Sequence, residues 1–191
     1  MVKTLYLDDC SFTYGSNLKP QETLNHLFVE SGYDVTNCSR PGKSNLAIAL
    51  DTFNKAQDHD VIVIGWTFSS RFYLKYLDLH IDLLPSRLQI ELPTAVDSNC
   101  IETSYMHLQK HFYSLHDTDY FNNLSDMLIS QTYYQLHALG KKIVFFSWEK
   151  RKVENIYYPH VQANHRLKCG HLNADGTTHL CNTLQGLINE Q

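Results

Sequence analysis

A serine stands where the first strand-like segment of the sequence ends. Residues 4–7 form a short apolar run that favours a strand, and the polar residues 8–11 follow directly, with Ser11 the last of them. Gly15 then marks the exit towards a helical pattern. At a strand-to-helix turn, backbone N–H groups point outward with partial positive charge, which suits a nucleophile or an anion site. Ser11 is therefore a candidate for either role, although serine also occurs at such turns simply as a helix cap.

Two segments at opposite ends of the chain resemble a known family. Residues 9–15 read DCSFTYG, and residues 169–179 read CGHLNADGTTH. Together they resemble the first and last sequence blocks of the SGNH, or GDSL-type, hydrolase superfamily. Cys10 stands where most members have Asp, and the His-x-Asn core of the last block matches His171 to Asn173. Within the superfamily the sequence resembles compact members with a Cys-Ser-Phe-Thr first block, several of them encoded by viruses of bacteria.

The resemblance implies a serine hydrolase site. Ser11 matches the nucleophile, and His171 matches the base that takes its proton. Ser11, Gly42, Thr67 and Asn45 are the expected donors to the oxyanion: Gly42 matches the second block, Thr67 stands in place of the Asn of the third block, and Asn45 lies one turn after Gly42. A Pro-Gly pair also serves a plain turn, so Gly42 has that second interpretation.

Further residues complete or weaken the match. Arg71 and Trp66 are the expected substrate-binding residues, and Arg71 is expected to bind an anionic group or to form an ordinary surface ion pair. Cys169 and Lys168 occupy the positions where the family has the Asp that orients the base, so a Ser–His dyad is expected in place of a triad. Asp175 follows the histidine and lies on the wrong side of the motif.

The elements that must position these residues alternate between strand and helix. Strands are predicted over residues 4–7, 33–38, 60–66 and 142–148, and helices over 17–32, 46–56, 102–115, 118–139, 149–156 and 177–189. This order predicts one domain over residues 1–191, a three-layer α/β/α sandwich with a central parallel sheet, the flavodoxin-like architecture of SGNH hydrolases. An insertion is expected at about 67–117, helical at its start and irregular beyond it. The site is expected at the carboxyl ends of the strands.

Composition narrows the class of protein. With 191 residues and 43% hydrophobic residues, the chain can form one globular core. A formal net charge of −4 at pH 7 argues against a dedicated nucleic-acid binder, and no apolar run is long enough to span a membrane. Five scattered cysteines without a CxxC pair, and no signal-peptide pattern, predict reduced thiols in the cytoplasm and no structural zinc. No cofactor is expected, and the sequence leaves the oligomeric state open.

Three functions follow as hypotheses. The leading one is an esterase or deacylase that acts on a small-molecule or carbohydrate ester through Ser11 and His171. The alternative is a degenerate SGNH fold that binds a ligand or a protein without efficient catalysis, because the orienting Asp and the oxyanion Asn are replaced. The third is a flavodoxin-like phosphate or nucleotide binder, although no Walker or GxGxxG pattern accompanies it.

Overall fold

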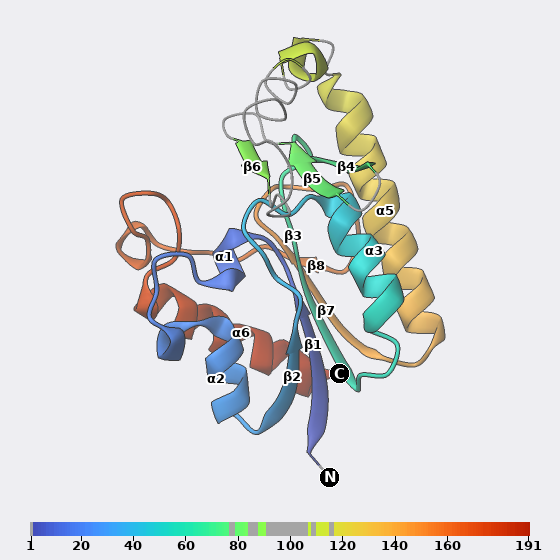
Figure 1. Cartoon of the computed structure of the whole chain (residues 1–191). Helices are drawn as coiled ribbons and strands as arrows, with labels where there is room; N and C mark the ends of the chain where they lie inside the picture. The colour runs from blue at the N-terminus through green and yellow to red at the C-terminus, as the bar shows by residue number, and fades with distance from the viewer. Residues whose placement is uncertain (1, 77–78, 84–87, 91–106, 108–109, 115–116) are drawn as a thin grey trace.

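A five-stranded parallel sheet forms the centre of the molecule (Figure 1). The computed structural model describes the chain except for residues 1, 77–78, 84–87, 91–106, 108–109 and 115–116. The sheet has the order β2-β1-β3-β7-β8. Its strands are β1 (Lys3–Asp8), β2 (Tyr33–Asn37), β3 (Val61–Trp66), β7 (Lys142–Ser147) and β8 (Ile156–Tyr157). β3 pairs with β1 and β7 on its two sides and is buried along its whole length.

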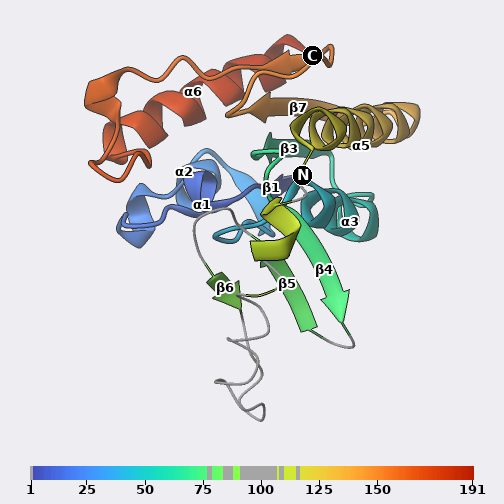
Figure 2. The ribbon, with the colours of Figure 1, turned by 90° about the horizontal axis from the view of Figure 1, so that it is seen from above.

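Helices cover both faces of this sheet, as Figure 2 shows from above. On one face lie α2 (Leu24–Glu30) and α6 (Ala174–Glu190), and on the other lie α3 (Asn45–Lys55) and α5 (Thr118–Ala138). The predicted three-layer α/β/α sandwich is thereby confirmed. None of the helices within the described ranges is long and apolar enough to cross a membrane.

Alternation along the strands builds the two core layers. In β3, Val61 and Val63 pack towards α2 and α6, whereas Ile62 and Ile64 pack towards α3 and α5. Successive side chains of a strand point to opposite faces, so a strand covered on both faces must be apolar at every position. Each such aliphatic side chain contributes about 1.5–3 kcal/mol when fully buried. The continuous apolar run of residues 61–64 is the sequence signature of this central strand.

The parallel strands end at a common edge. Asp8 of β1 is in register with Ile64, and Trp66 at the end of β3 is in register with Ser147 of β7. The short helix α1 (Ser11–Tyr14) begins just beyond β1 at this edge. Because ligand sites of open α/β sheets form beyond the carboxyl ends of the strands, this edge is where functional side chains are expected.

The segment after β3 differs from its prediction. Residues 67–71 form loop and turn rather than a helical start, and three strands follow as a separate antiparallel sheet. They are β4 (Phe72–Tyr76), β5 (Leu79–Leu83) and β6 (Leu88–Ile90). The aromatic residues of β4 favour a strand, which overrides the weak helical periodicity. Of the predicted helix 102–115, residues 107 and 110–114 are helical, and the others lie outside the described residues.

Two predicted helices are also corrected. The predicted helix 17–32 is shortened to α2, because Asn17 has φ +72° and Thr23 caps the helix by accepting the N–H of His26. The predicted helix 149–156 is instead irregular and ends in β8. Asn155 has φ +60°, which a right-handed helix excludes, and the backbone N–H of Arg151 donates to the Tyr158 hydroxyl instead of to a helical carbonyl.

Candidate active site

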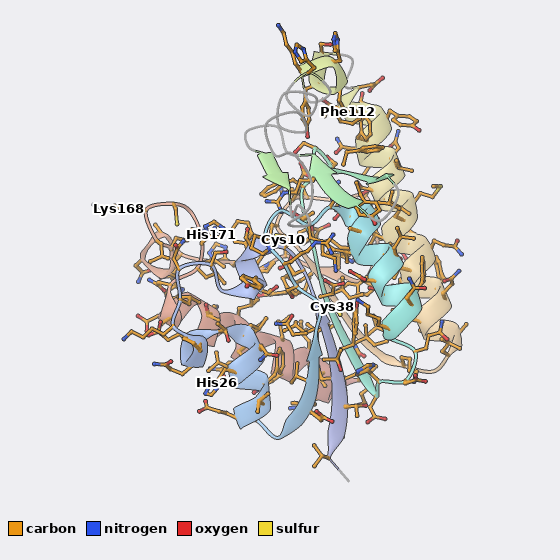
Figure 3. The ribbon with its side chains drawn as sticks, in the orientation of Figure 1. Cys10, His26, Cys38, Phe112, Lys168 and His171 are labelled. Carbon is orange, nitrogen blue, oxygen red and sulfur yellow. The ribbon has the colours of Figure 1, made fainter. Side chains whose placement is uncertain are left out.

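Ser11 and His171 meet although 160 residues separate them in the chain. The Oγ of Ser11 and the Nε2 of His171 lie 2.9 Å apart, which is within hydrogen-bond distance. Ser11 is the first residue of α1, beyond the end of β1, and His171 lies in the loop before α6. In Figure 3 His171 and Cys10, the neighbour of Ser11, lie at a similar height in the view, near α1. Ser11 is 8% exposed, and His171 is half-buried, which leaves a path to solvent.

The loop that carries His171 is held by its own backbone and by Asn173. The carbonyl of His171 accepts the N–H of Leu167 at 2.7 Å, and Leu172 is buried in the core. Asn173 caps α6 by accepting the N–H of Gly176 at 2.9 Å, and its amide donates to the carbonyl of Asn164. The asparagine of the His-x-Asn pattern is thus a helix cap that fixes the position of the histidine two residues earlier.

The electrostatic surroundings keep His171 neutral. Partial burial lowers the pKa of its imidazole, and the positive charges of Arg71 and Arg166 lower it further. A neutral imidazole at pH 7 has a free nitrogen that can accept the Ser11 proton. The ring of Phe12 in α1 also contacts the His171 imidazole, with 5.0 Å between the two ring centroids.

Cys169 is the residue that contacts the second nitrogen of His171. Its Sγ lies 3.4 Å from Nδ1, and the amide of Asn17 approaches the same sulfur at 3.7 Å. Lys168 is exposed, and Asp175 lies in the first turn of α6. Among the described residues no carboxylate is paired with His171, so sulfur occupies the place of an orienting acid.

Three of the residues predicted to stabilise the oxyanion have a hydrogen-bond donor that is not used by the described residues. Gly42 is buried with φ +76°, a conformation that a side chain would strain, and no acceptor among the described residues takes its N–H. The hydroxyl of Thr67 is buried beside the Cys10 thiol and has no partner at regular hydrogen-bond distance in the described part of the chain. Ser11 is the first residue of α1, where backbone N–H groups are free of helical bonds.

Asn45 has a different role from the one expected. Its side-chain oxygen accepts the N–H of Thr67 at 2.8 Å, and its amide donates to the Thr67 carbonyl at 3.1 Å and to Ser125 at 3.2 Å. Both amide hydrogens are therefore used, and none is left for an oxyanion. The structure corrects the prediction, because Asn45 fixes the backbone of Thr67 and thereby the place of the Thr67 hydroxyl.

Of the two predicted substrate-binding residues, Arg71 lies near the site and Trp66 does not. Trp66 is fully buried and packs against Phe145 in the core beside α3 and α5, so its prediction as a substrate contact is wrong. Because side chains alternate along β3, the Trp66 side chain lies on the same face as Ile62 and Ile64, under α3 and α5, and not at the carboxyl edge of the sheet. Arg71 instead lies over the ring of Phe68 at 5.4 Å, and its charge reaches His171.

Sequence reasoning missed the group on the other side of the site. Trp148 follows β7, stacks on Phe12 at 4.6 Å and lies under the guanidinium of Arg166 at 6.0 Å. The only signal for Trp148 was its place as the last residue of the strand predicted over 142–148, at the carboxyl edge of the sheet. Arg166 lies in a segment predicted as loop, and no sequence pattern tied it to the site.

A buried acid lies behind the nucleophile. Asp9 is fully buried, accepts the N–H of Cys10 at 2.5 Å and accepts the indole N–H of Trp148 at 3.1 Å. Burial raises the pKa of its carboxyl, and burial also raises the pKa of the Cys10 thiol to about 11. A Cβ on Gly65 would overlap this carboxyl, so glycine is required there. Asp9 thus holds Trp148 at the edge of the site.

A buried ion pair between Lys43 and Asp8 fixes the loop that carries Gly42. Lys43 is fully buried, and its Nζ lies 2.6 Å from Asp8 and 2.6 Å from Asp51. It also donates to the carbonyl of Cys38 at 3.0 Å. Burial raises the pKa of the Asp8 carboxyl to about 7, against the effect of the neighbouring lysine. This ion pair ties the residue next to Gly42 to the end of β1.

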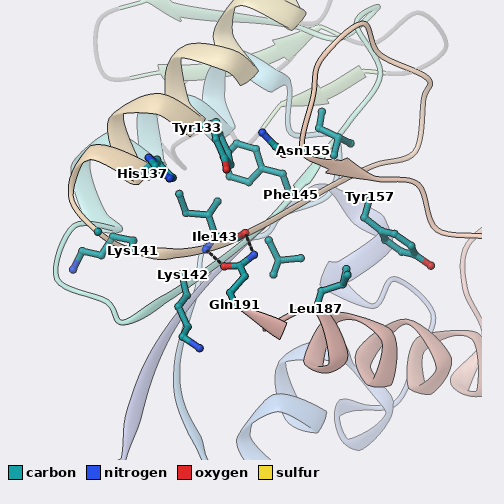
Figure 4. Close-up of a pocket in the computed structure, with 13 residues that line it drawn as sticks. Tyr133, His137, Lys141, Lys142, Ile143, Phe145, Asn155, Tyr157, Leu187 and Gln191 are labelled. Atoms are coloured by element: carbon teal, nitrogen blue, oxygen red, sulfur yellow. Dashed lines mark hydrogen bonds between the residues drawn. The ribbon is translucent and has the colours of Figure 1, made fainter. Parts of the chain in front are cut away.

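A cavity of about 830 Å³ lies away from this edge (Figure 4). It is lined by the amino-terminal part of β7 and by residues of α5 and α6, among them Ile143, Tyr133 and Leu187. Gln191 also lines it, and its side chain accepts the N–H of Ile143 at 2.9 Å and donates to the Ile143 carbonyl at 2.6 Å. Because Ser11 and His171 do not line it, the candidate active site is the carboxyl edge of the sheet.

Comparison with known proteins gives a structural likeness. No protein-family model and no curated protein sequence matches the chain. The structure resembles that of TesA, with a TM-score of 0.54 and 12% identity over 97% of this chain and 98% of that one. It also resembles the psychrotrophic esterase EstA from Pseudoalteromonas sp., with a TM-score of 0.54 and 8% identity over 98% of this chain and 97% of that one. At these identities the likeness shows the fold alone.

Proposed function

We propose that this chain, which has the SGNH-hydrolase fold, is a serine esterase or deacylase that cleaves an ester or acetyl group of a small molecule or carbohydrate. The observation that carries the proposal is the 2.9 Å contact between the Oγ of Ser11 and the Nε2 of His171 at the carboxyl edge of the sheet. A hydroxyl next to a neutral imidazole is the pair that nucleophilic acyl transfer requires.

The reaction divides into two transfers. Nε2 of His171 accepts the Ser11 proton while Oγ forms a bond to the carbonyl carbon, and the carbonyl electron pair moves onto the oxygen. The bond to the alcohol then breaks, and the alcohol takes the proton from His171. Water next gives a proton to His171 and attacks the acyl-serine, so the carboxylic acid leaves and Ser11 regains its proton.

The oxyanion is stabilised by the free N–H of Gly42, the N–H of Ser11 and the Thr67 hydroxyl. A lost oxyanion donor typically costs about 2.7–4 kcal/mol of transition-state stabilisation, and Thr67 replaces an amide donor here. Together with sulfur in place of a carboxylate at His171, this favours a slow or specialised enzyme over a general one.

Labelling by a fluorophosphonate probe tests the nucleophile. The wild type should be labelled, and Ser11→Ala should lose the label while its thermal unfolding midpoint stays close to that of the wild type. Ser16→Ala, five residues along the chain, is the matched control and should keep the label. Equal labelling of Ser11→Ala would remove the proposal.

A ligand- or protein-binding module is the second candidate function. It is favoured by one observation, the lack of a carboxylate paired with His171 among the described residues. If the wild type neither reacts with the probe nor hydrolyses 4-nitrophenyl acetate above the spontaneous rate, this function replaces the enzyme.

A further inference from the structure

Two arginines flank the candidate site, and neither is paired with an acid in the part of the chain that the structure describes. Among the described residues Arg71 donates to the carbonyl of Lys43, at 3.4 Å, and Arg166 donates to the carbonyl of Gly170, at 2.7 Å. Neither guanidinium has a carboxylate partner within the described residues, whereas Arg40 and Arg151 have one at 3.6 and 2.6 Å. Most hydrogens of each guanidinium, which carries five donors, are therefore free.

Aromatic rings hold both guanidinium groups beside the nucleophile. The aromatic row consists of Phe68, Phe12 and Trp148, with centroids 6.4 Å apart for the first pair and 4.6 Å apart for the second. Arg71 lies over Phe68 at one end, and Arg166 lies over Trp148 at the other. Phe12, the middle ring, directly follows Ser11 in α1. All five side chains are half-buried, so they are both fixed and open to solvent.

This positive charge is local and has a cost for the proposed chemistry. The chain as a whole has a formal net charge of −4, so two unneutralised arginines at one site are a feature of the site and not of the surface. Both lower the pKa of His171, and no carboxylate among the described residues opposes them. The imidazolium that forms during acyl transfer would therefore stand between like charges.

We propose that the substrate of this site is an anionic ester, one that carries a carboxylate or phosphate near the ester bond and binds it to Arg71 and Arg166. The inference rests on the proposed serine hydrolase function and names its substrate class. The substrate anion supplies the negative charge that the protein does not place at His171. A neutral ester binds to the same aromatic row but leaves both guanidinium groups uncompensated.

The arrangement couples binding to chemistry. A planar guanidinium binds a carboxylate or phosphate through paired, charge-assisted hydrogen bonds. Once the anion is bound, the net charge around His171 falls, and its basicity rises in the complex with the correct substrate only. The substrate anion thus takes over part of the electrostatic role that a triad carboxylate has in other serine hydrolases.

Matched ester pairs test the substrate class. One pair is 4-acetoxybenzoate and its neutral methyl ester, with the charge on the alcohol side. The other is mono-4-nitrophenyl adipate and its methyl ester, with the charge on the acyl side. After correction for spontaneous hydrolysis, kcat/KM for the anionic member of at least one pair should exceed that of its neutral partner by on the order of tenfold or more, as hydrogen bonds to charged groups provide. The pair with the larger ratio identifies the side of the ester that carries the anion.

Arginine variants then assign the preference to residues. Arg71→Gln and Arg166→Gln should each lower the anionic-to-neutral ratio, and the double variant should bring it close to one. Lys3→Gln is the control, because it removes one exposed positive charge at the start of β1, at the opposite edge of the sheet. That variant should keep the wild-type ratio. Raised salt should lower the wild-type ratio, since it screens the half-buried guanidinium groups.

The outcomes separate the two proposals. If the protein hydrolyses both members of each pair equally well, the substrate inference is wrong and the hydrolase proposal stands. If the anionic preference survives in the double arginine variant, the two arginines are only structural and the inference is again wrong. If no ester is hydrolysed and the fluorophosphonate probe does not label Ser11, the hydrolase proposal itself has failed.

Discussion

At Nδ1 of His171 the chain places a sulfur atom where a carboxylate would orient an imidazolium. A thiol is a weak hydrogen-bond acceptor, and the 3.4 Å separation from Sγ is consistent with such a contact. The two arginines add positive charge around the same ring. At the residue scale the candidate site therefore has its nucleophile and base in contact but lacks charge stabilisation of the base.

Replacing this sulfur by a carboxylate should activate the enzyme. We expect Cys169→Asp to raise kcat/KM for 4-nitrophenyl acetate by about tenfold or more, since the orienting acid contributes orders of magnitude in full triads. The new charge should also raise the pKa of His171, so the acid limb of the pH–rate profile moves to higher pH. Cys169→Asn, equal in shape but neutral, is the control. An equal gain with Asn, or a lower rate with Asp, would contradict the assignment of Cys169.

Gly65 tests the packing around the buried Asp9. A Cβ at Gly65 would overlap the Asp9 carboxyl and the ring of Phe146, so Gly65→Ala should destabilise the protein by about 1–3 kcal/mol in urea unfolding. Gly186→Ala is the control, because nothing lies within 4 Å of a Cβ there and the position is helical. That change should be neutral or stabilise by up to about 1 kcal/mol. Similar effects of the two substitutions would mean that Asp9 can move.

At the scale of elements, the carboxyl ends of β1 and β3 and the amino end of α3 are tied together by polar side chains. Asn45 binds the backbone of Thr67, and Lys43 binds Asp8 and Asp51. Buried charges are stable only when they are paired, so Lys43 and Asp8 require each other, and a buried amide such as that of Asn45 likewise requires its hydrogen-bond partners. The loop that carries Gly42 is thereby held against the end of β1.

Loss of the buried lysine should cost much of the stability of the fold. We expect Lys43→Met to lower the free energy of unfolding by about 3–5 kcal/mol, because it leaves Asp8 buried without its cation. Lys55→Met is the matched control: Lys55 contacts the same Asp51 from an exposed position, and its loss should cost at most about 1 kcal/mol.

A double variant separates the ion pair from simple packing. Asp8→Asn combined with Lys43→Met should be more stable than Lys43→Met alone, since no uncompensated buried charge remains. Urea unfolding measures the free energy of unfolding of the wild type, Lys43→Met, Lys55→Met and the double variant. An equal loss in the single and double variants would show that lysine packing, and not charge pairing, holds the loop.

At the scale of the whole molecule, stability should fall from the centre of the sheet to its margin. β3 is buried on both faces and paired on both sides, whereas β8 pairs over two residues at the sheet edge. Hydrogen exchange should therefore be slowest in β3 and faster by orders of magnitude in β8, because edge segments open without global unfolding. Comparable protection of the two strands in a mass-spectrometric exchange experiment would contradict this order.

The sequence by itself determined the layers and the two ends of the site. Apolar strand runs and amphipathic helices repeat with periods that report local burial, so the α/β/α sandwich was predictable. Ser11 and His171 could be paired because each lies in a short motif. The His171 motif has a physical reason, because its Asn173 caps α6 and thereby fixes the position of the histidine. Parallel strands then bring such motifs to one edge regardless of their separation in the chain.

Only the tertiary structure decided which neighbouring residues face the site. Trp66 and Thr67 are adjacent and both fully buried, yet Trp66 packs into the core beside α3 and α5, whereas Thr67 follows the end of β3 and is held there by Asn45. Asn45 was assigned to the oxyanion by its spacing, but its amide hydrogens are donated to the Thr67 carbonyl and the Ser125 hydroxyl, both distant in sequence. Arg166 carries no motif and reaches the site through its stacking on Trp148. Such contacts join segments far apart in the chain, and no local pattern records them.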